Sequence, residues 1–163
     1  MGVTAGPADW WVATPQSFSG LITSCPAGTI LPDGSALICK AGGTAWIVAP
    51  FCTEVISTWS SSVNSVVGER CCVCDWSTLC SRLISCGFNP TDWFVPSKTQ
   101  LQNPGSVCRS RWDFCRGSGY CYWSSTELNG LQACTVRLND AYAGRQTKST
   151  TGPYVRAMRC VTY

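Results

Sequence analysis

The sequence predicts an α+β fold for this chain, with short helices packed against small antiparallel strands and long loops. Its 163 residues are the length of one ordinary domain with a real core. Gly, Pro, Ser and Thr are spread evenly, which is typical of many short strands joined by turns. One central segment carries helical periodicity, and the C-terminal third carries strand and turn patterns.

Residues 1–24 are expected to form an extended N-terminal arm or a first strand, and residues 25–163 the domain itself. A hairpin is predicted over 21–40, because Leu31-Pro-Asp-Gly34 suits a type I turn followed by a glycine bulge. A short buried strand is expected over 45–50.

The clearest helix lies over 75–87, where apolar side chains recur at helical spacing. Asp75 can cap its start, and Gly87 stands where a C-terminal glycine belongs. A strand end at 92–97 then leads to a short second helix that begins at Lys98.

The C-terminal third predicts a hairpin of 120–126 with 131–138 about Asn129-Gly130. A two-residue loop places Trp123 opposite Val136 and turns both to the core, since side chains alternate along a strand. The other face, with Tyr122, Ser124 and Thr135, is then expected to face water. A last strand is predicted over residues 154–161.

The chain has no histidine, which excludes Ser-His-Asp and Cys-His catalysis and histidine-rich zinc sites. The adjacent serines of Tyr122–Glu127 are therefore interpreted as strand-end architecture, and no enzyme activity, catalytic residue, metal or cofactor is expected. Charged residues are only 13% of the chain and the basic ones are scattered, so nucleic-acid binding is not expected. No apolar run is long enough for membrane insertion.

Thirteen cysteines indicate an oxidising destination, and their odd number leaves at least one thiol unpaired or bonded to another chain. The N-terminus does not resemble a signal peptide. Three explanations stay open: a signal peptide lost from this chain, thiols that remain reduced in the core, or a virion protein released by lysis, which we favour over the first.

Individual cysteines also leave alternatives. Cys25 and Cys39 lie at the open end of the first predicted hairpin, as a disulfide or as two separate thiols. Cys71 and Cys74, followed by Cys80 and Cys86, have partial zinc-knuckle spacing, but disulfides or reduced thiols suit them as well.

Three later segments share a pattern with a known family: Trp93–Leu101 (WFVPSKTQL), Tyr122–Glu127 (YWSSTE) and Tyr154–Arg159 (YVRAMR). With these three segments in this order, the chain over roughly residues 25–163 resembles the C-terminal domain of unknown function of bacterial collagen-like adhesins. Phage fibres also carry this domain. That family is similar to the C-type-lectin fold, shared with formylglycine-generating enzymes.

The resemblance implies a C-type-lectin-like fold in which Trp93, Trp123 and Tyr154 are structural. It also implies a disulfide between the first helix and the last strand, here Cys80 or Cys86 with Cys160. The heavy cysteine load departs from the family pattern. The segments 102–104 and 139–140 only distantly resemble calcium-binding lectin motifs and are interpreted as turns.

Binding residues are expected where arginines mix with aromatics, in the loop region 101–120, because interfaces favour this mixture. The candidates there are Arg109, Arg111, Trp112 and Phe114, although core filling explains the aromatics equally well. Trp10 and Trp11 of the arm are expected to anchor a neighbouring subunit.

The expected function is that of a non-enzymatic virion surface protein, a capsid decoration or fibre component of bacteriophage type. Its partners would be other virion proteins or further copies of itself, and the host surface. The alternative is a secreted bacterial adhesin or glycan-binding domain. A weaker third hypothesis is a zinc-stabilised intracellular binding module.

Overall fold

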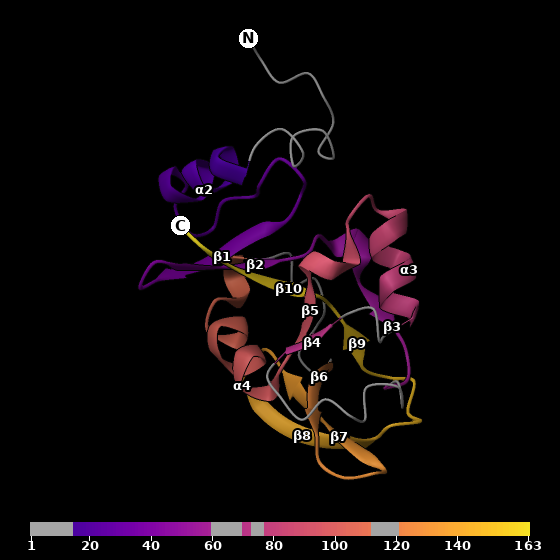
Figure 1. The fold of residues 1–163 in the computed structure, drawn as a ribbon. Coiled ribbons are helices and arrows are strands. Elements are labelled where there is room, and N and C mark those ends of the chain that lie inside the picture. The colour runs from indigo at the N-terminus through magenta and orange to yellow at the C-terminus, as the bar shows by residue number, and fades with distance from the viewer. Residues whose placement is uncertain (1–14, 60–69, 73–76, 112–120) are drawn as a thin grey trace.

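Two five-stranded sheets organise the chain in the computed structural model, which describes residues 15–59, 70–72, 77–111 and 121–163 (Figure 1). The helical elements are short: α2 (Pro15–Ser24), η1 (Phe51–Thr53), α3 (Ser77–Ser85), η4 (Pro90–Asp92), α4 (Lys98–Gln100), η5 (Leu101–Ser106) and η6 (Arg109–Arg111). This mixed α+β architecture is the one that the sequence predicts.

Sheet A has the order β1-β2-β10-β5-β4 and is antiparallel throughout. Its strands are β1 (Ala36–Ala41), β2 (Thr44–Val48), β10 (Met158–Thr162), β5 (Phe94–Pro96) and β4 (Arg70–Cys72). Strand β10, from the C-terminal end, thus lies in the middle of the sheet, between two elements from much earlier in the chain.

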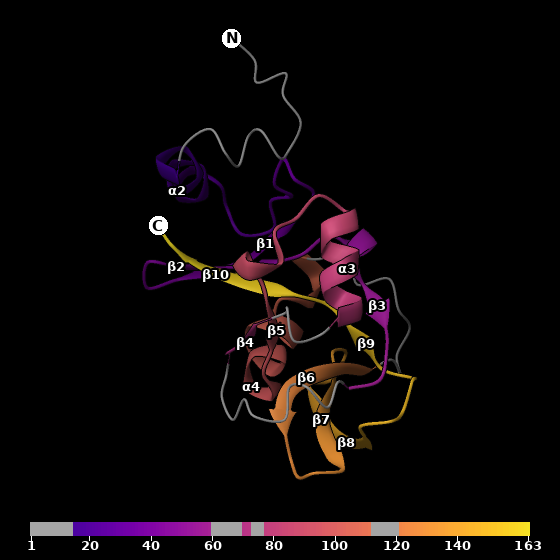
Figure 2. The same ribbon diagram turned by 45° about the vertical axis from the view of Figure 1, so that its right-hand side comes forward.

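Sheet B has the order β3-β9-β6-β7-β8. Its strands are β3 (Val55–Ile56), β9 (Tyr154–Val155), β6 (Cys121–Glu127), β7 (Gln132–Arg137) and β8 (Tyr142–Thr147). Only the β6–β9 pair is parallel. In Figures 1 and 2, β6, β7 and β8 lie at the end of the molecule away from α2.

The buried side chains form two clusters. The first core cluster takes in α2 through Ile22 and α3 through Leu79 and Leu83, with Trp59, Trp93 and Trp123 among its largest members. The second core cluster takes in Leu101 and Cys108 of the region after α4, with Ile38, Val48, Tyr122, Val136, Leu138, Tyr154 and Met158.

Helix α3 confirms the prediction over 75–87 as far as it is described. Leu79 and Leu83, one turn apart, are fully buried. Gly87 has φ +87°, and the N–H groups of Gly87 and Phe88 donate to the carbonyls of Ile84 and Leu83 at 3.0 and 2.9 Å. This is the Schellman pattern that glycine favours at a helix end.

The first predicted hairpin forms around its turn, with Ile30 opposite Ala36, although residues 21–24 belong to α2, and the second predicted helix forms as α4. Gly34 N–H donates to Leu31 O at 2.8 Å, and Gly34 has φ +85°, as the predicted turn requires. Ser97 and Gln100 form a reciprocal capping box at the start of α4, which satisfies backbone donors on both sides.

The predicted extended arm is wrong for its last ten residues, which form helix α2. Ile22 of α2 is fully buried in the first core cluster. The end of α2 is held by Lys40 of β1, whose Nζ donates to the carbonyls of Ile22, Thr23 and Cys25 at 2.7 to 3.0 Å. A lysine can supply the donors that the last carbonyls of a helix lack.

The C-terminal hairpin forms, but its predicted register is wrong. Trp123 pairs with Thr135, and it is Tyr122 that pairs with Val136. The side chain of Asn129 accepts hydrogen bonds from the N–H groups of Leu131 and Gln132, both at 2.9 Å. The loop is longer than the predicted two residues, and a register shift between Trp123 and Glu127 then brings Trp123 opposite Thr135.

The face of β6 that was expected to meet water is buried as well. Tyr122 is 1% exposed and packs in the second core cluster, while Trp123 on the opposite face packs in the first. Ser124 is buried with its hydroxyl donating to Cys134 O at 2.8 Å. A serine that bonds to backbone can be buried at little cost, so polarity does not mark a wet face here.

The predicted single last strand is also wrong, because it divides into β9 in sheet B and β10 in sheet A. The chain crosses between the sheets at Arg156 and Ala157. The other described crossing, residues 49–54, runs beside it, since Ala49 N–H donates to Ala157 O at 3.0 Å.

Arg156 ties these two crossings together inside the core. Its Nε donates to Ala49 O at 2.8 Å, and its Nη1 lies 3.7 Å from Glu54 Oε2. The side chains of Arg156 and Glu54 are 1% and 3% exposed. Tyr122 of β6 donates its hydroxyl to the same carboxylate oxygen at 2.6 Å. A buried charge needs such partners, because its desolvation is expensive.

We expect Arg156→Met to lower the free energy of unfolding by about 3–5 kcal/mol, because Glu54 is then left buried without its cation. Urea denaturation measures this. Adding Glu54→Gln should restore part of the loss. The matched control is Arg137→Met, whose partner Asp140 is exposed. Equal stability changes for the two arginine variants would contradict the prediction.

Candidate functional site

The arginines predicted to bind a partner are exposed but bonded within the domain. Arg109 donates to Ser106 O at 3.1 Å, and Arg111 donates to Ile38 O at 2.9 Å. Arg111 therefore fastens the 101–111 segment to β1, whereas the Arg109 bond lies within that segment. The predicted partners Trp112 and Phe114, like Trp10 and Trp11 of the arm, lie outside the described residues.

The three aromatics expected to be structural are all buried. Trp93 packs edge-on against Phe88, with their ring centroids 5.5 Å apart. The Arg159 guanidinium lies 5.7 Å from the centroid of the Trp93 ring. Tyr154 meets Tyr122 with ring centroids 5.9 Å apart. Trp123 is fully buried. The three segments that carry the family resemblance therefore contact one another in pairs.

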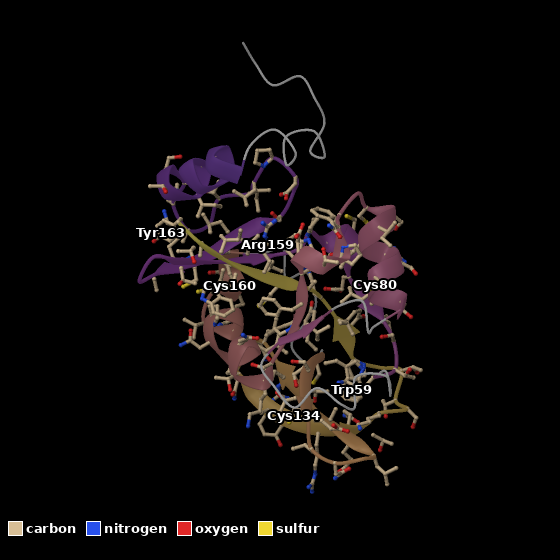
Figure 3. All side chains as sticks on the ribbon, viewed as in Figure 1. Trp59, Cys80, Cys134, Arg159, Cys160 and Tyr163 are labelled. Carbon is tan, nitrogen blue, oxygen red and sulfur yellow. The ribbon has the colours of Figure 1, made fainter. Side chains whose placement is uncertain are left out.

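The expected disulfides Cys25–Cys39 and Cys80 or Cys86 with Cys160 are not formed. Cys25 and Cys80 pack against the first core cluster, whereas Cys39 packs against the second. Cys160 pairs with Trp46, whose ring belongs to the second cluster. Figure 3 shows Cys80 on α3 well away from Cys160 on β10. Different sides of sheet A thus separate the expected partners.

The remaining motif segments do not gather a metal site where they are described. Cys74 lies outside the described residues, and among the described ones no three Cys, Asp or Glu side chains come together. Asp140 accepts from Arg137 Nε at 3.0 Å and from Tyr142 N–H at 3.1 Å. Gln102 donates to Ala141 O at 2.9 Å. These are turn contacts.

The structure instead shows an open cleft of about 370 Å³ between α3 and the segment of η1 and β3. Figure 2 shows β3 and β9 beside α3. No sequence motif marks this place. Its lining is half apolar and half polar: Phe51, Cys52, Glu54, Val55, Ile56, Thr78, Arg82 and Tyr154.

One wall of the cleft contains Glu54, whose carboxylate is held in place by the buried ion pair with Arg156. The Arg156 guanidinium also lies 5.8 Å from the centroid of the Phe51 ring, a cation–π contact. Thr53, between Phe51 and Glu54, is fully buried and donates its hydroxyl to Pro50 O at 2.6 Å. The residues of this wall are thus held by contacts with the buried core beneath them.

The opposite wall presents Thr78 and Arg82, one turn apart on α3. Arg82 is exposed, and within the described part of the chain its guanidinium has no hydrogen-bond or ion-pair partner. Phe51 and Ile56 at the mouth are 38% and 55% exposed. The cleft therefore combines an uncompensated cation with exposed apolar side chains, which marks binding surfaces more often than ordinary protein surface.

Cys52 is the nucleophile closest to the cleft, but it is held protonated. Burial, and then a hydrogen bond with the Cys86 side chain, raise the pKa of Cys52 to about 11. The Cys86 thiol in turn lies 3.4 Å from Cys52 O. Since the thiolate is the reactive form, Cys52 is poorly suited to nucleophilic catalysis near neutral pH.

Sequence reasoning missed the cleft because its residues come from three distant segments. Glu54 has ordinary loop neighbours, and Arg82 is one helix residue among several exposed ones. The available signal was the isolated acid at Glu54 in a chain with few charges. Its partner, Arg156, could be recognised only from the fold.

No protein-family model and no curated protein matches this chain. Within the described ranges, no helix is long and apolar enough to cross a membrane. Fold and site together define the class: an α+β domain of two sheets with a cationic, partly apolar cleft beside α3.

We predict that in the reduced protein Cys52 reacts about tenfold more slowly with iodoacetamide at pH 8 than a free cysteine, because its high pKa leaves little thiolate. The rate should climb as the pH approaches 11. Cys86→Ala should speed the reaction by removing an interaction that raises the pKa, whereas Cys25→Ala should not. A rate at pH 8 equal to that of free cysteine would contradict this.

Proposed function

We propose that this chain is a non-enzymatic protein of a bacteriophage-type virion surface, which decorates a capsid or forms part of a fibre and binds other virion proteins. The resemblance of Trp93–Leu101, Tyr122–Glu127 and Tyr154–Arg159 to a domain that phage fibres carry supports the location. The cysteine content, high for a protein that stays in the cytosol, supports it as well.

The proposal includes a C-type-lectin-like fold for residues 25–163. The short helices and two small sheets are compatible with that fold. Its three characteristic segments also pack together, and Thr126 of β6 accepts from the Lys98 backbone N–H at 2.9 Å.

Three of the described carboxylates are held in ion pairs, which suits them poorly to acid–base catalysis. Glu54 is paired with Arg156, and Glu127 with Lys148. Arg137 holds the Asp140 carboxylate and keeps the pKa of that group below its usual range. Acid–base catalysis instead needs a carboxyl group free to exchange a proton near the working pH.

The cleft is the observation that carries the binding role. Arg82 supplies a cation that no described residue pairs with, and Phe51 and Ile56 supply exposed apolar surface beside it. The matching partner is a protein segment that places an apolar side chain against Phe51 and Ile56 and a carboxylate beside Arg82. We assign that segment to a neighbouring virion protein.

We expect Arg82→Glu and Ile56→Asp each to reduce incorporation of the chain into particles at least tenfold, since each places a negative charge against a partner that carries one. The control is Ile84→Asp, which alters an exposed residue of α3 that does not line the cleft. Particles from complemented cells are banded on a density gradient, and the chain is quantified by mass spectrometry. The melting temperature (Tm) of each purified variant shows that it folds.

Equal incorporation of the three variants would remove the cleft from the proposal. Failure of the unaltered chain to band with particles would remove the virion location itself. If the chain is then found in the medium or on the cell surface, the alternative of a secreted adhesin or glycan-binding domain takes its place.

A further inference from the structure

Within the described ranges, two pairs of cysteines lie together, and neither pairing was expected from the sequence. The first is Cys52 of η1 with Cys86, just after α3. The Cys86 thiol donates to Cys52 O at 3.4 Å, and the Cys86 side chain is near enough to raise the pKa of Cys52 further, beyond the effect of burial. Cys52 is exposed and Cys86 half-buried, so reagents in solution can reach this pair.

The second pair is Cys39 of β1 with Cys108, which follows η5. Cys108 is buried in the second core cluster and Cys39 packs against the same cluster. Burial, together with the nearby Cys39, raises the pKa of Cys108. Arg111 Nη1 donates to Ile38 O at 2.9 Å and lies 3.9 Å from Cys108 Sγ. Arg111 thus holds the segment that carries Cys108 against the strand that carries Cys39.

We propose that, within the described ranges, Cys52 forms a disulfide with Cys86, and Cys39 one with Cys108, when this domain meets an oxidising environment. In each pair the two S–H bonds break and one S–S bond forms. The two electrons and two protons pass to a disulfide oxidant, which is reduced to two thiols. The inference rests on the proposed extracellular location only for the supply of this oxidant.

The pairings that were expected from the sequence are instead separated by the fold. Cys25 and Cys80 pack in the first core cluster, and Cys160 belongs to the side of sheet A that carries Trp46. Cys134 is 4% exposed within β7. A bridge that joins these residues across sheet A would require backbone movement, because disulfide geometry is specific.

Each bridge would connect elements that lie far apart in the chain. Cys52–Cys86 joins the loop between the sheets to the end of α3, and so joins the two walls of the cleft. Cys39–Cys108 joins β1 to the 101–111 segment, which holds the predicted binding arginines Arg109 and Arg111. Both surfaces proposed for partner contact would thus be fixed covalently.

Peptide mapping of the intact protein tests the pairing. The refolded full chain is oxidised with glutathione disulfide, alkylated without reduction, digested and analysed by mass spectrometry. The digest is expected to contain the peptide of Cys52 crosslinked to that of Cys86, and the peptide of Cys39 crosslinked to that of Cys108. Free alkylated Cys52 and Cys86, or crosslinks of 25 with 39 and of 80 or 86 with 160, would overturn the proposal.

Thermal unfolding provides a second measurement. Oxidation should raise the Tm of the unaltered chain by roughly 5–15 °C, since each bridge closes a long loop. Cys52→Ser and Cys108→Ser should each lose part of this rise, and the control Cys25→Ser should keep it. An oxidation-induced rise that Cys25→Ser abolishes would overturn the assignment. These results do not depend on finding the chain in particles, so the two proposals can fail separately.

Discussion

Burial of the Arg156 guanidinium is the constraint on which the joining of the two sheets depends. The described chain passes between the sheets at residues 49–54 and again at 156–157, and Arg156 bonds to the first crossing from within the second. Glu54 and Tyr122 complete the network, so that a strand of sheet B is held to the same point. A buried ion pair is weak evidence for stability, but it strongly penalises any packing that separates its members. Here that penalty specifies one arrangement of two small sheets.

The cleft follows from this arrangement. Glu54 and Phe51 line one wall, and both contact the buried guanidinium of Arg156. Thr78 and Arg82 line the opposite wall, because Leu79 and Leu83 are buried on the core-facing side of α3. Core packing beneath each wall therefore determines where the cleft-lining residues lie. Its two walls come from elements that a bridge between Cys52 and Cys86 would link, and the proposed binding role depends on their separation.

Local patterns in the sequence predict the parts of the fold that local physics determines. The periodicity of α3, the glycine at position 87 and the turn at Leu31–Gly34 all act within a few residues, and each prediction is correct. Helix α2 was missed because its end is satisfied by Lys40, a residue of β1. The register of β6 was missed because the pairing shifts between Trp123 and Glu127, an irregularity that no local pattern marks. The cleft was missed for the same kind of reason, since Glu54 and Arg156 become partners only through the fold.

The central place of β10 in sheet A has a consequence for folding kinetics. Strand β10 pairs with β2 along its whole length, although most of the chain lies between them. Pairings so distant in sequence slow folding, because the entropy of closing the intervening loop is lost before the contacts form. During that delay many cysteines are exposed to wrong partners. A chain of this topology should therefore refold in higher yield when it is first folded under reducing conditions and oxidised only afterwards.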